Sequence, residues 1–99
     1  MGYKLIFTKR AQKDIKKIES SELKEKAIEL LKILQSDPFQ NPPPFEQLVG
    51  DLRGFCSRRI NIKHRLVYTV EENVNMETDQ NNVPYKGIVR ISSLWTHYE

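Results

Sequence analysis

Hydrophobic residues follow two different periods along this chain, and the change of period divides it into a helical part and a later β-rich part. Residues 3–8 are short, apolar and rich in β-forming types, which predicts a strand. Within residues 9–19, and again between Ser21 and Pro38, apolar residues recur at spacings of three and four, which predicts two amphipathic helices. From Leu52 onward the spacing becomes that of strands.

Polar residues indicate where the two predicted helices begin and end. The Thr8 hydroxyl can accept a hydrogen bond from an otherwise unpaired amide of the first helical turn, so Thr8 is the predicted cap of the first helix. Ser20 and Ser21 are the predicted caps of the second helix. Pro38 should end it. We expect the two helices to form an antiparallel hairpin laid across a sheet.

Three strands are predicted in the second part of the chain. Residues 55–60 and 65–70 should form a hairpin around the polar turn at 61–64, and residues 86–95 should return as a last strand. Residues 71–87 are polar and predict a long, flexible connection. The order β-α-α-β-β-β indicates an α+β fold, with two helices on a mostly antiparallel, four-stranded sheet.

Length and composition set bounds on the class of protein. Ninety-nine residues fit a single domain, 1–99, with 38% hydrophobic and 29% charged residues. No apolar run is long enough to cross a membrane, and no signal peptide is recognisable, so we expect a cytoplasmic protein that does not bind membranes. The lone Cys56 cannot form an internal disulfide, which agrees with a reducing compartment.

The charge is unevenly distributed, although the net charge is only +3. Residues 53–65 carry five basic residues and no acidic one, whereas residues 71–79 carry four acidic residues and no basic one. Cations bind phosphates, and aromatic rings such as those of Phe55 and Tyr68 can stack on unpaired bases. A solvated strand edge explains most runs of this size, but the pattern also predicts an RNA-binding surface, formed by Arg53, Phe55, Arg58, Arg59 and Lys63.

A small set of side chains could cleave RNA without a metal ion. Such cleavage needs a base for the 2′-hydroxyl, a cation for the phosphorane, and an acid for the leaving 5′-oxygen. Glu46, either Arg59 or Arg65, and His97 offer these three groups. Spacing alone does not bring them together. Cys56 and His64 are too few for a zinc site, and we expect no metal and no cofactor.

Several motifs of the chain resemble those of the YoeB/Txe toxins, which belong to the RelE-like superfamily of type II toxin–antitoxin systems. The resemblance covers nearly the whole chain. It is carried by Pro38-Phe39, Glu46-x-Leu48, Leu52-x-Gly-Phe-x-Ser-Arg-Arg-Ile60, His64-Arg-Leu-Val-Tyr68 and the terminal His97-Tyr98. The Ser-Arg-Arg-Ile run followed by His-Arg-Leu-Val-Tyr is specific, although each piece alone is not.

The resemblance implies the RelE-like microbial RNase fold and a ribosome-dependent endoribonuclease that cuts messenger RNA in the decoding site and halts translation. It implies Glu46 as the general base, Arg65 as the group that stabilises the scissile phosphate, and His97 as the acid. Tyr98 would orient the nucleotide, and Arg59 would contact the RNA backbone. A 2′,3′-cyclic phosphate or its opened form would result. The implied partners are the ribosome and messenger RNA, a YefM/Phd-like antitoxin, and a second copy in a homodimer.

Three positions depart from the pattern of these toxins. Residues 71–82 resemble an insertion within the 71–87 connection. Val49 stands where some relatives carry a basic residue, and Cys56 replaces a common aromatic residue. Two other functions therefore remain open: a non-catalytic module that binds RNA or ribosomes through the same surface, and a toxin of this fold with another target, as in the gyrase-directed toxins. Retention of Glu46, Arg65 and His97 argues against the second.

Overall fold

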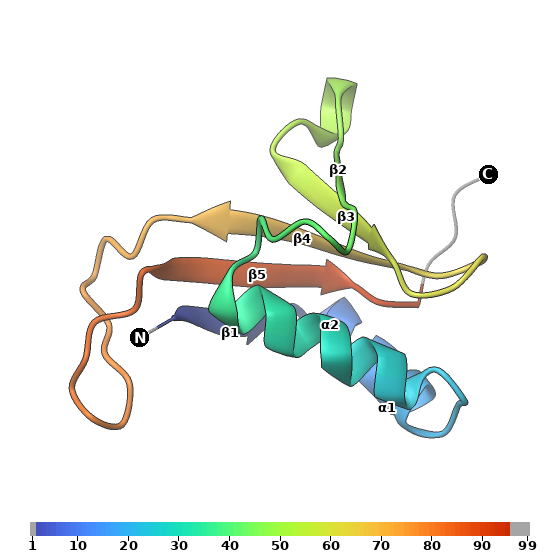
Figure 1. Cartoon of the computed structure of the whole chain (residues 1–99), viewed down its shortest axis with the longest axis horizontal. Coiled ribbons are helices and arrows are strands. Elements are labelled where there is room, and N and C mark those ends of the chain that lie inside the picture. Colours follow the sequence, from blue (N-terminus) through green and yellow to red (C-terminus); the bar gives the residue numbers. More distant parts are fainter. Residues whose placement is uncertain (1, 96–99) are drawn as a thin grey trace.

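The first and last strands of the chain lie side by side inside one five-stranded sheet of order β1-β5-β4-β3-β2 (Figure 1). The computed structural model describes residues 2–95. The strands are β1 (Tyr3–Phe7), β2 (Glu46–Gln47), β3 (Phe55–Arg59), β4 (Arg65–Glu71) and β5 (Gly87–Ser93). Because β1 and β5 pair in parallel and the other three pairings are antiparallel, the sheet is mixed but mostly antiparallel.

The α+β class and the element order are confirmed, but the sheet has five strands where four were expected. The additional strand is β2, in which Glu46 pairs with Ser57 and Gln47 with Cys56. A strand of two residues gives no periodic signal in a sequence. The short 3₁₀ helix η1 (Gly50–Leu52) then leads into the tight return to β3.

Two helices, α1 (Lys9–Glu19) and α2 (Lys24–Ser36), pack on the part of the sheet formed by β1 and β5. In Figure 1 both helices lie below β5 and α2 passes in front of β1, whereas β2 and β3 lie well away from the helices. The Thr8 hydroxyl accepts a hydrogen bond from the amide of Ala11 at 3.1 Å, which confirms the predicted cap of α1. The apolar stripes of both helices are buried against the sheet, as their spacing predicts.

The predicted cap of α2 is wrong. The helix begins after Leu23, and no side chain caps its first turn. The Ser21 hydroxyl instead donates to the carbonyl oxygen of Ile18 at 2.8 Å and accepts from the amide of Leu23 at 3.1 Å. Ser20 likewise bonds back to carbonyls of α1. Both serines therefore stabilise the turn between the helices, because the last turn of α1 offers carbonyl acceptors within reach.

One hydrophobic core joins the helices to the sheet. The best-buried apolar side chains come from both helices, from β4 and β5, and from the start of the C-terminal segment: Ala11, Ala27, Leu30, Leu34, Leu66, Tyr68, Val89, Ile91 and Leu94. Because β5 lies between β1 and β4, it joins the first strand of the chain to the antiparallel part of the sheet.

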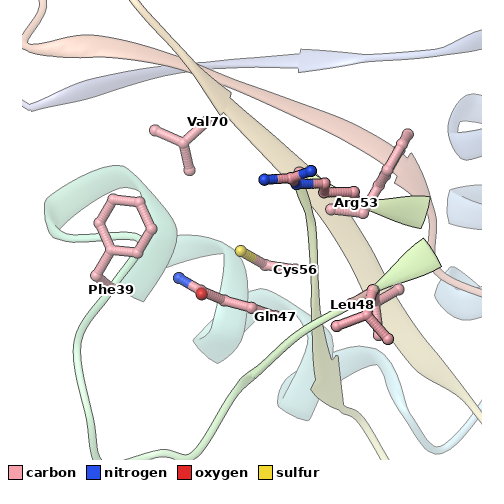
Figure 2. A pocket seen from close by; sticks show the side chains of 9 residues that line it. Phe39, Gln47, Leu48, Arg53, Cys56 and Val70 are labelled. Carbon is pink, nitrogen blue, oxygen red and sulfur yellow. The ribbon is translucent and has the colours of Figure 1, made fainter. Parts of the chain in front are cut away.

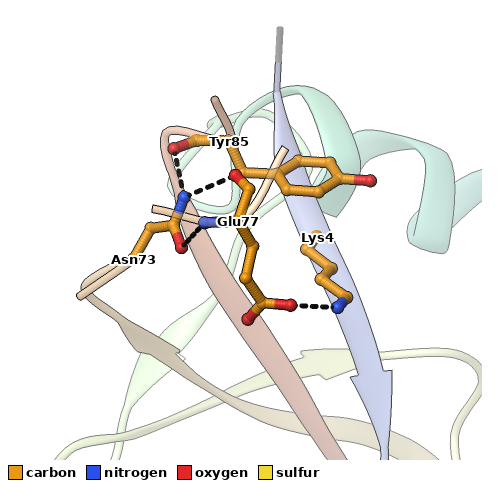
Figure 3. Close-up of polar contacts among 4 residues, drawn as sticks. All are labelled: Lys4, Asn73, Glu77 and Tyr85. Atoms are coloured by element: carbon orange, nitrogen blue, oxygen red, sulfur yellow. Dashed lines mark hydrogen bonds and ion pairs between the residues drawn. The ribbon is translucent and has the colours of Figure 1, made fainter. Parts of the chain in front are cut away.

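The connection from β4 to β5 is ordered by its own hydrogen bonds, which corrects the expectation of a flexible segment. The side-chain amide of Asn73 donates to the main-chain carbonyl oxygens of Glu77 and Tyr85, and its oxygen accepts from the main-chain N–H of Glu77 (Figure 3). The Glu77 carboxylate also forms an ion pair with Lys4 on β1. A polar composition does not predict such a network, because it depends on which amide groups the turns bring together.

Candidate active site

Glu46 and Arg65 approach each other across three strands because of the register of the sheet. Glu46 on β2 lies opposite Ser57 on β3, and Ser57 lies opposite Val67 on β4. Arg65 is two residues before Val67, so it lies on the same face of the sheet. Arg59 lies directly opposite Arg65 and shares that face. The antiparallel pairing thus gathers two cations and a carboxylate on one face.

These residues line an open cleft of about 290 Å³, together with Ser57, Pro44 and Phe45. An Arg65 guanidinium nitrogen lies 3.7 Å from a carboxylate oxygen of Glu46 and 3.3 Å from the Ser57 hydroxyl oxygen. The Arg65 side chain is 21% exposed, whereas that of Glu46 is 66% exposed. The cleft therefore offers a held guanidinium and a carboxylate that solvent or substrate can reach.

The charges of the cleft favour an anionic ligand. Arg59 and Arg65 outnumber Glu46 among its lining residues, and Arg59 is exposed. Guanidinium groups bind phosphate oxygens through paired hydrogen bonds. A phosphate bound here would lie beside the Glu46 carboxylate, which is the arrangement needed to remove a proton from a neighbouring hydroxyl. The sequence analysis did not include Ser57 among the site residues. Its position two residues before Arg59 could have indicated it, because residues two apart in a strand lie on the same face.

Arg58 does not lie on the predicted RNA-binding surface, and this expectation is corrected. Its side chain is 1% exposed, and its guanidinium donates to the carbonyl oxygens of Pro38, Gln40 and Pro43 at 2.7–2.9 Å and to the Tyr68 hydroxyl at 3.1 Å. Strand alternation turns Arg58 to the core side, where these carbonyls satisfy its donors. Arg58 thus holds the connector 38–44 that leads to Glu46.

Tyr68 was also expected to present a ring to bases, and it is wholly buried instead. Its hydroxyl donates to the carbonyl oxygen of Pro38 at 2.7 Å. Burial raises the pKa of Tyr68 to about 12, against an opposing effect of Arg58. Cys56, whose replacement of an aromatic residue was noted above, is buried in the same region, and burial raises the pKa of its thiol. Neither side chain is accessible to RNA.

Arg53 and Phe55 line a second cavity, separate from the cleft of Glu46. This cavity of about 510 Å³ is also lined by Phe39, Gln47, Leu48, Cys56 and Val70 (Figure 2). Gln47 faces it because successive strand residues point to opposite faces, so β2 divides the two cavities. Lys63 is exposed in the turn 60–64, which the Asn61 side chain closes by accepting from the amides of Lys63 and His64. The residues predicted as one RNA-binding surface are therefore dispersed.

The predicted catalytic residues His97 and Tyr98 lie outside the described residues. The chain that leads to them is described as far as Trp95, whose ring stacks on the His64 imidazole with centroids 4.1 Å apart. His64 immediately precedes Arg65. The end of the described chain thus lies against the start of β4, where the cleft residue Arg65 is located.

Two features are absent from residues 2–95. In this range, no three or more His, Cys, Asp and Glu side chains are grouped as a metal site would require. Neither helix in the same range has the length and apolar character needed to span a membrane.

Comparison with solved structures identifies the general class of this fold. A YoeB/ParE toxin from Agrobacterium tumefaciens superposes with a TM-score of 0.77 at 26% identity, over 96% of this chain and 99% of that one. A YoeB from Staphylococcus aureus, solved in a heterotetrameric complex with YefM, gives a TM-score of 0.68 at 30% identity over 99% of this chain and all of that one. The same toxin solved as a dimer gives 0.70. The fold is that of the RelE-like bacterial toxins.

The sequence comparisons identify the family within this class. The model of the YoeB-like toxins of bacterial type II toxin–antitoxin systems matches residues 7–85. This chain belongs to that family. A Toxin YoeB from Synechocystis sp. is 46% identical over 43 residues, which cover 43% of this chain and half the length of that relative.

Proposed function

We propose that this chain is a ribosome-dependent endoribonuclease that cleaves messenger RNA in the decoding site and so inhibits translation. The observation that carries the proposal is the Glu46–Arg65 pair, a carboxylate and a guanidinium 3.7 Å apart in one open cleft. Membership of the YoeB-like toxins supports the same reading. The pair alone contains a base and an anion-binding group, which are two of the three parts that the reaction requires.

In the proposed reaction, the Glu46 carboxylate takes the proton of the 2′-hydroxyl, and the resulting oxygen attacks the adjacent phosphorus. Arg65 stabilises the negative charge that develops on the phosphorane. As the bond from phosphorus to the 5′-oxygen breaks, His97 donates a proton to that oxygen. The products are a 2′,3′-cyclic phosphate and a 5′-hydroxyl, and the step consumes no metal or cofactor.

Binding of substrate also separates the pair. A phosphate anion competes with Glu46 for the Arg65 guanidinium, because both are anions that the same donors can bind. When the phosphate takes Arg65, the Glu46 carboxylate is left to face the ribose. Ser57 keeps its contact with Arg65 in this arrangement and so holds the guanidinium in place. Arg59 contacts the RNA backbone from the opposite strand, and Tyr98 orients the nucleotide.

The role proposed for His97 is supported by its position in the chain. It follows Trp95 by two residues, and two residues of extended chain span at most about 7 Å. Trp95 stacks on His64, the neighbour of Arg65. The described chain thus ends beside the neighbour of Arg65, which supports the choice of a residue from this segment as the acid.

The partners proposed for this chain are messenger RNA on the ribosome and an antitoxin of the YefM type, which places its action in the cytoplasm. The toxin from Staphylococcus aureus has been solved both with YefM and as a dimer, and these structures support an antitoxin complex and a homodimer here. The exposed cations of the cleft suit an acidic antitoxin segment as well as RNA.

The test is to incubate the purified chain with ribosomes programmed with a defined messenger RNA and to map the RNA ends. A His97→Ala variant and the same RNA without ribosomes serve as controls. We expect cuts at the decoding site only when both ribosomes and His97 are present. Intact RNA together with tight, salt-dependent ribosome binding would contradict the proposal and identify a non-catalytic binding module.

A further inference from the structure

The solvent-facing side of α1 concentrates positive charge. Residues 9–17 contain five basic residues and one acidic residue, so the formal charge of this short segment exceeds the +3 of the whole chain. The acidic residue, Asp14, is only 4% exposed. The five cations are all exposed: Lys9, Arg10, Lys13, Lys16 and Lys17. The outer side of this helix therefore presents cations with no exposed carboxylate among them.

The spacing of these cations places them along one side of the helix. At about 100° per residue, the five side chains fall within about 120° of the helix circumference, and the stretch from Lys9 to Lys17 is about 12 Å long. The buried residues Ala11, Asp14 and Ile18 lie on the other side, against the sheet. The five cations are called the α1 basic stripe below.

The one carboxylate of this stretch is turned inward. An oxygen of Asp14 accepts hydrogen bonds from the backbone amides of Leu94, at 3.0 Å, and Trp95, at 3.2 Å. Arg10 approaches it only to 3.9 Å. Among residues 2–95, the four lysines of the stripe form no ion pair. The charge of the stripe is thus largely uncompensated, and it is available to an anionic partner.

The neighbouring helix α2 shows no such separation of charge. Its exposed charged residues alternate in sign along the first three turns: Lys24, Glu25, Lys26, Glu29 and Lys32. Mixed signs of this kind are typical of a helix face that is only solvated. One helix of the pair therefore carries cations alone, while the other serves as an internal comparison with the same number of exposed lysines as a triple variant requires.

The composition of the stripe favours RNA over protein as its partner. The cores of protein interfaces are enriched in aromatic residues and depleted of lysine. Among the residues that the structure describes, none of the exposed large apolar side chains belongs to α1. A phosphate backbone, in contrast, is bound through cations without any apolar anchor. The stripe thus has the groups that a phosphate backbone needs and lacks those that a protein interface needs.

The stripe and the cleft of Glu46 and Arg65 can be occupied at the same time. The helix α1 packs on β1 and β5, whereas the cleft residues come from β2, β3, β4 and the segment before β2 (Figure 1). Leu66 and Tyr68 belong to the core shared with the helices, so the alternation of β4 turns Arg65 to the other face of the sheet. A ligand on α1 would therefore not block the cleft.

We propose that the α1 basic stripe binds the phosphate backbone of ribosomal RNA while messenger RNA occupies the cleft. This inference rests on the proposed function, because dependence on the ribosome requires a contact with the ribosome besides the message. Each cation that neutralises a phosphate releases counterions, which adds affinity and makes that affinity depend on salt. The stripe does not touch the reacting groups, so its loss should weaken docking and leave the chemical step unchanged.

The variants compare the two helices at equal net charge. Lys9→Gln, Lys13→Gln and Lys16→Gln are combined in one chain, and Lys24→Gln, Lys26→Gln and Lys32→Gln are combined in the control chain. Each chain loses three positive charges, and glutamine has nearly the helix propensity of lysine. Thermal unfolding checks that both chains fold. Binding is measured by cosedimentation over a range of salt, with ribosomes whose message carries 2′-deoxyribose in the decoding codon and so lacks the attacking hydroxyl.

The α1 triple variant should bind ribosomes at least about tenfold more weakly than the parent at about 0.1 M salt. The slope of log affinity against log salt concentration should fall in magnitude by about 2. The α2 control should lose less than about threefold. On an ordinary message, the α1 variant should need more ribosomes for half-maximal single-turnover cleavage, but it should reach the rate of the parent at saturation.

Four results would contradict the inference or the function on which it rests. Equal weakening in the two triple variants would show that net charge alone matters. Unchanged ribosome affinity with weaker binding of a YefM-type antitoxin would assign the stripe to an acidic protein segment. A lower cleavage rate at saturating ribosomes would show that the stripe acts on the reaction and not on docking. If the parent binds ribosomes through the stripe but leaves the ordinary message intact, the proposed function fails while the docking site stands.

Discussion

Arg58 and Tyr68, on adjacent strands, share a single acceptor: both donate to the main-chain carbonyl oxygen of Pro38, at 2.9 and 2.7 Å. They also bond to each other, since the Arg58 guanidinium donates to the Tyr68 hydroxyl at 3.1 Å. This buried group connects the middle of the sheet to the segment that follows α2. Because that segment leads directly to Glu46, the same contacts that stabilise the fold also locate the proposed base.

Removal of the Arg58 guanidinium should strongly destabilise the protein. Arg58→Met leaves the carbonyl oxygens of Pro38, Gln40 and Pro43 without their donor, which should cost about 3 kcal/mol or more in the free energy of unfolding. Arg59→Met, at the exposed neighbouring position, should change it by no more than about 0.5 kcal/mol. Urea denaturation of both variants measures the difference. Equal losses of unfolding free energy in the two variants would mean that the buried hydrogen bonds of Arg58 contribute little to stability.

Stability should fall in strongly alkaline solution because Tyr68 is buried. The pKa of Tyr68 is raised from 10.0 to about 12 in the folded chain. Between these values the unfolded chain releases this proton and the folded chain keeps it, so the folded state binds more protons and stability decreases as the pH rises. The contribution is fully present below about pH 10, and its loss approaches about 3 kcal/mol only as the pH passes about 12.

The pH effect is measured by urea denaturation across this alkaline window, with Tyr68→Phe as the comparison. The phenylalanine variant lacks the titrating hydroxyl and should be less stable near neutral pH, because Arg58 and Pro38 lose a partner, but its stability should fall less steeply above about pH 10. Parallel curves for the two proteins would show that Tyr68 is not the group responsible.

Replacement of Glu46 should slow cleavage without weakening ribosome binding. Glu46→Gln keeps the size of the side chain and an oxygen that can face Arg65, but it removes the base, which should lower the single-turnover rate by about 10²-fold or more. Gln47→Ala is the control, because Gln47 faces the other cavity. A normal rate in Glu46→Gln would exclude Glu46 as the base, and a comparable loss of ribosome binding would indicate a structural role.

The Asn73 side chain should control the order of the connection between β4 and β5. Asn73→Ala removes three hydrogen bonds within this connection, so a protease that cuts after glutamate should cleave it faster at Glu72 or Glu77. Asn81→Ala is a matched control. Within residues 2–95, Asn81 donates a hydrogen bond to Asp79 through its main-chain N–H, which alanine keeps, and its side chain makes none. Mass spectrometry of the fragments gives the rates. Equal cleavage of both variants would contradict the proposed control by Asn73.

The sequence predicted those elements whose signals are local. The cap at Thr8, the two helical stripes and the turn closed by Asn61 depend on neighbouring residues alone, and all three are observed. The start of α2 was misassigned because Ser21 had two uses available, and its bonds to Ile18 and Leu23 could not be distinguished from a cap by residue type. Strand β2 was missed because two residues have no period.

The candidate site was predictable only in part, because residue types are read from the sequence but contacts between distant strands are not. Glu46 and Arg65 carry chemistry that their residue types reveal, but only the strand register brings them within 3.7 Å. Arg58 was misjudged from its charge, although it alternates with Cys56 and Ile60, a pattern that favours the apolar face of the strand.

The parallel pairing of β1 with β5 also determines when the protein can be completed during its own synthesis. Residues 3–7 are made long before their partners, residues 87–91. Until residues 87–91 are made, β1 lacks the strand β5 that pairs with it. Contacts between residues so distant in sequence form late. A chain interrupted before residue 87 exposes the edges of both β1 and β4, which are open to pairing with other chains. We therefore expect incomplete translation to yield an aggregation-prone fragment instead of a smaller folded protein.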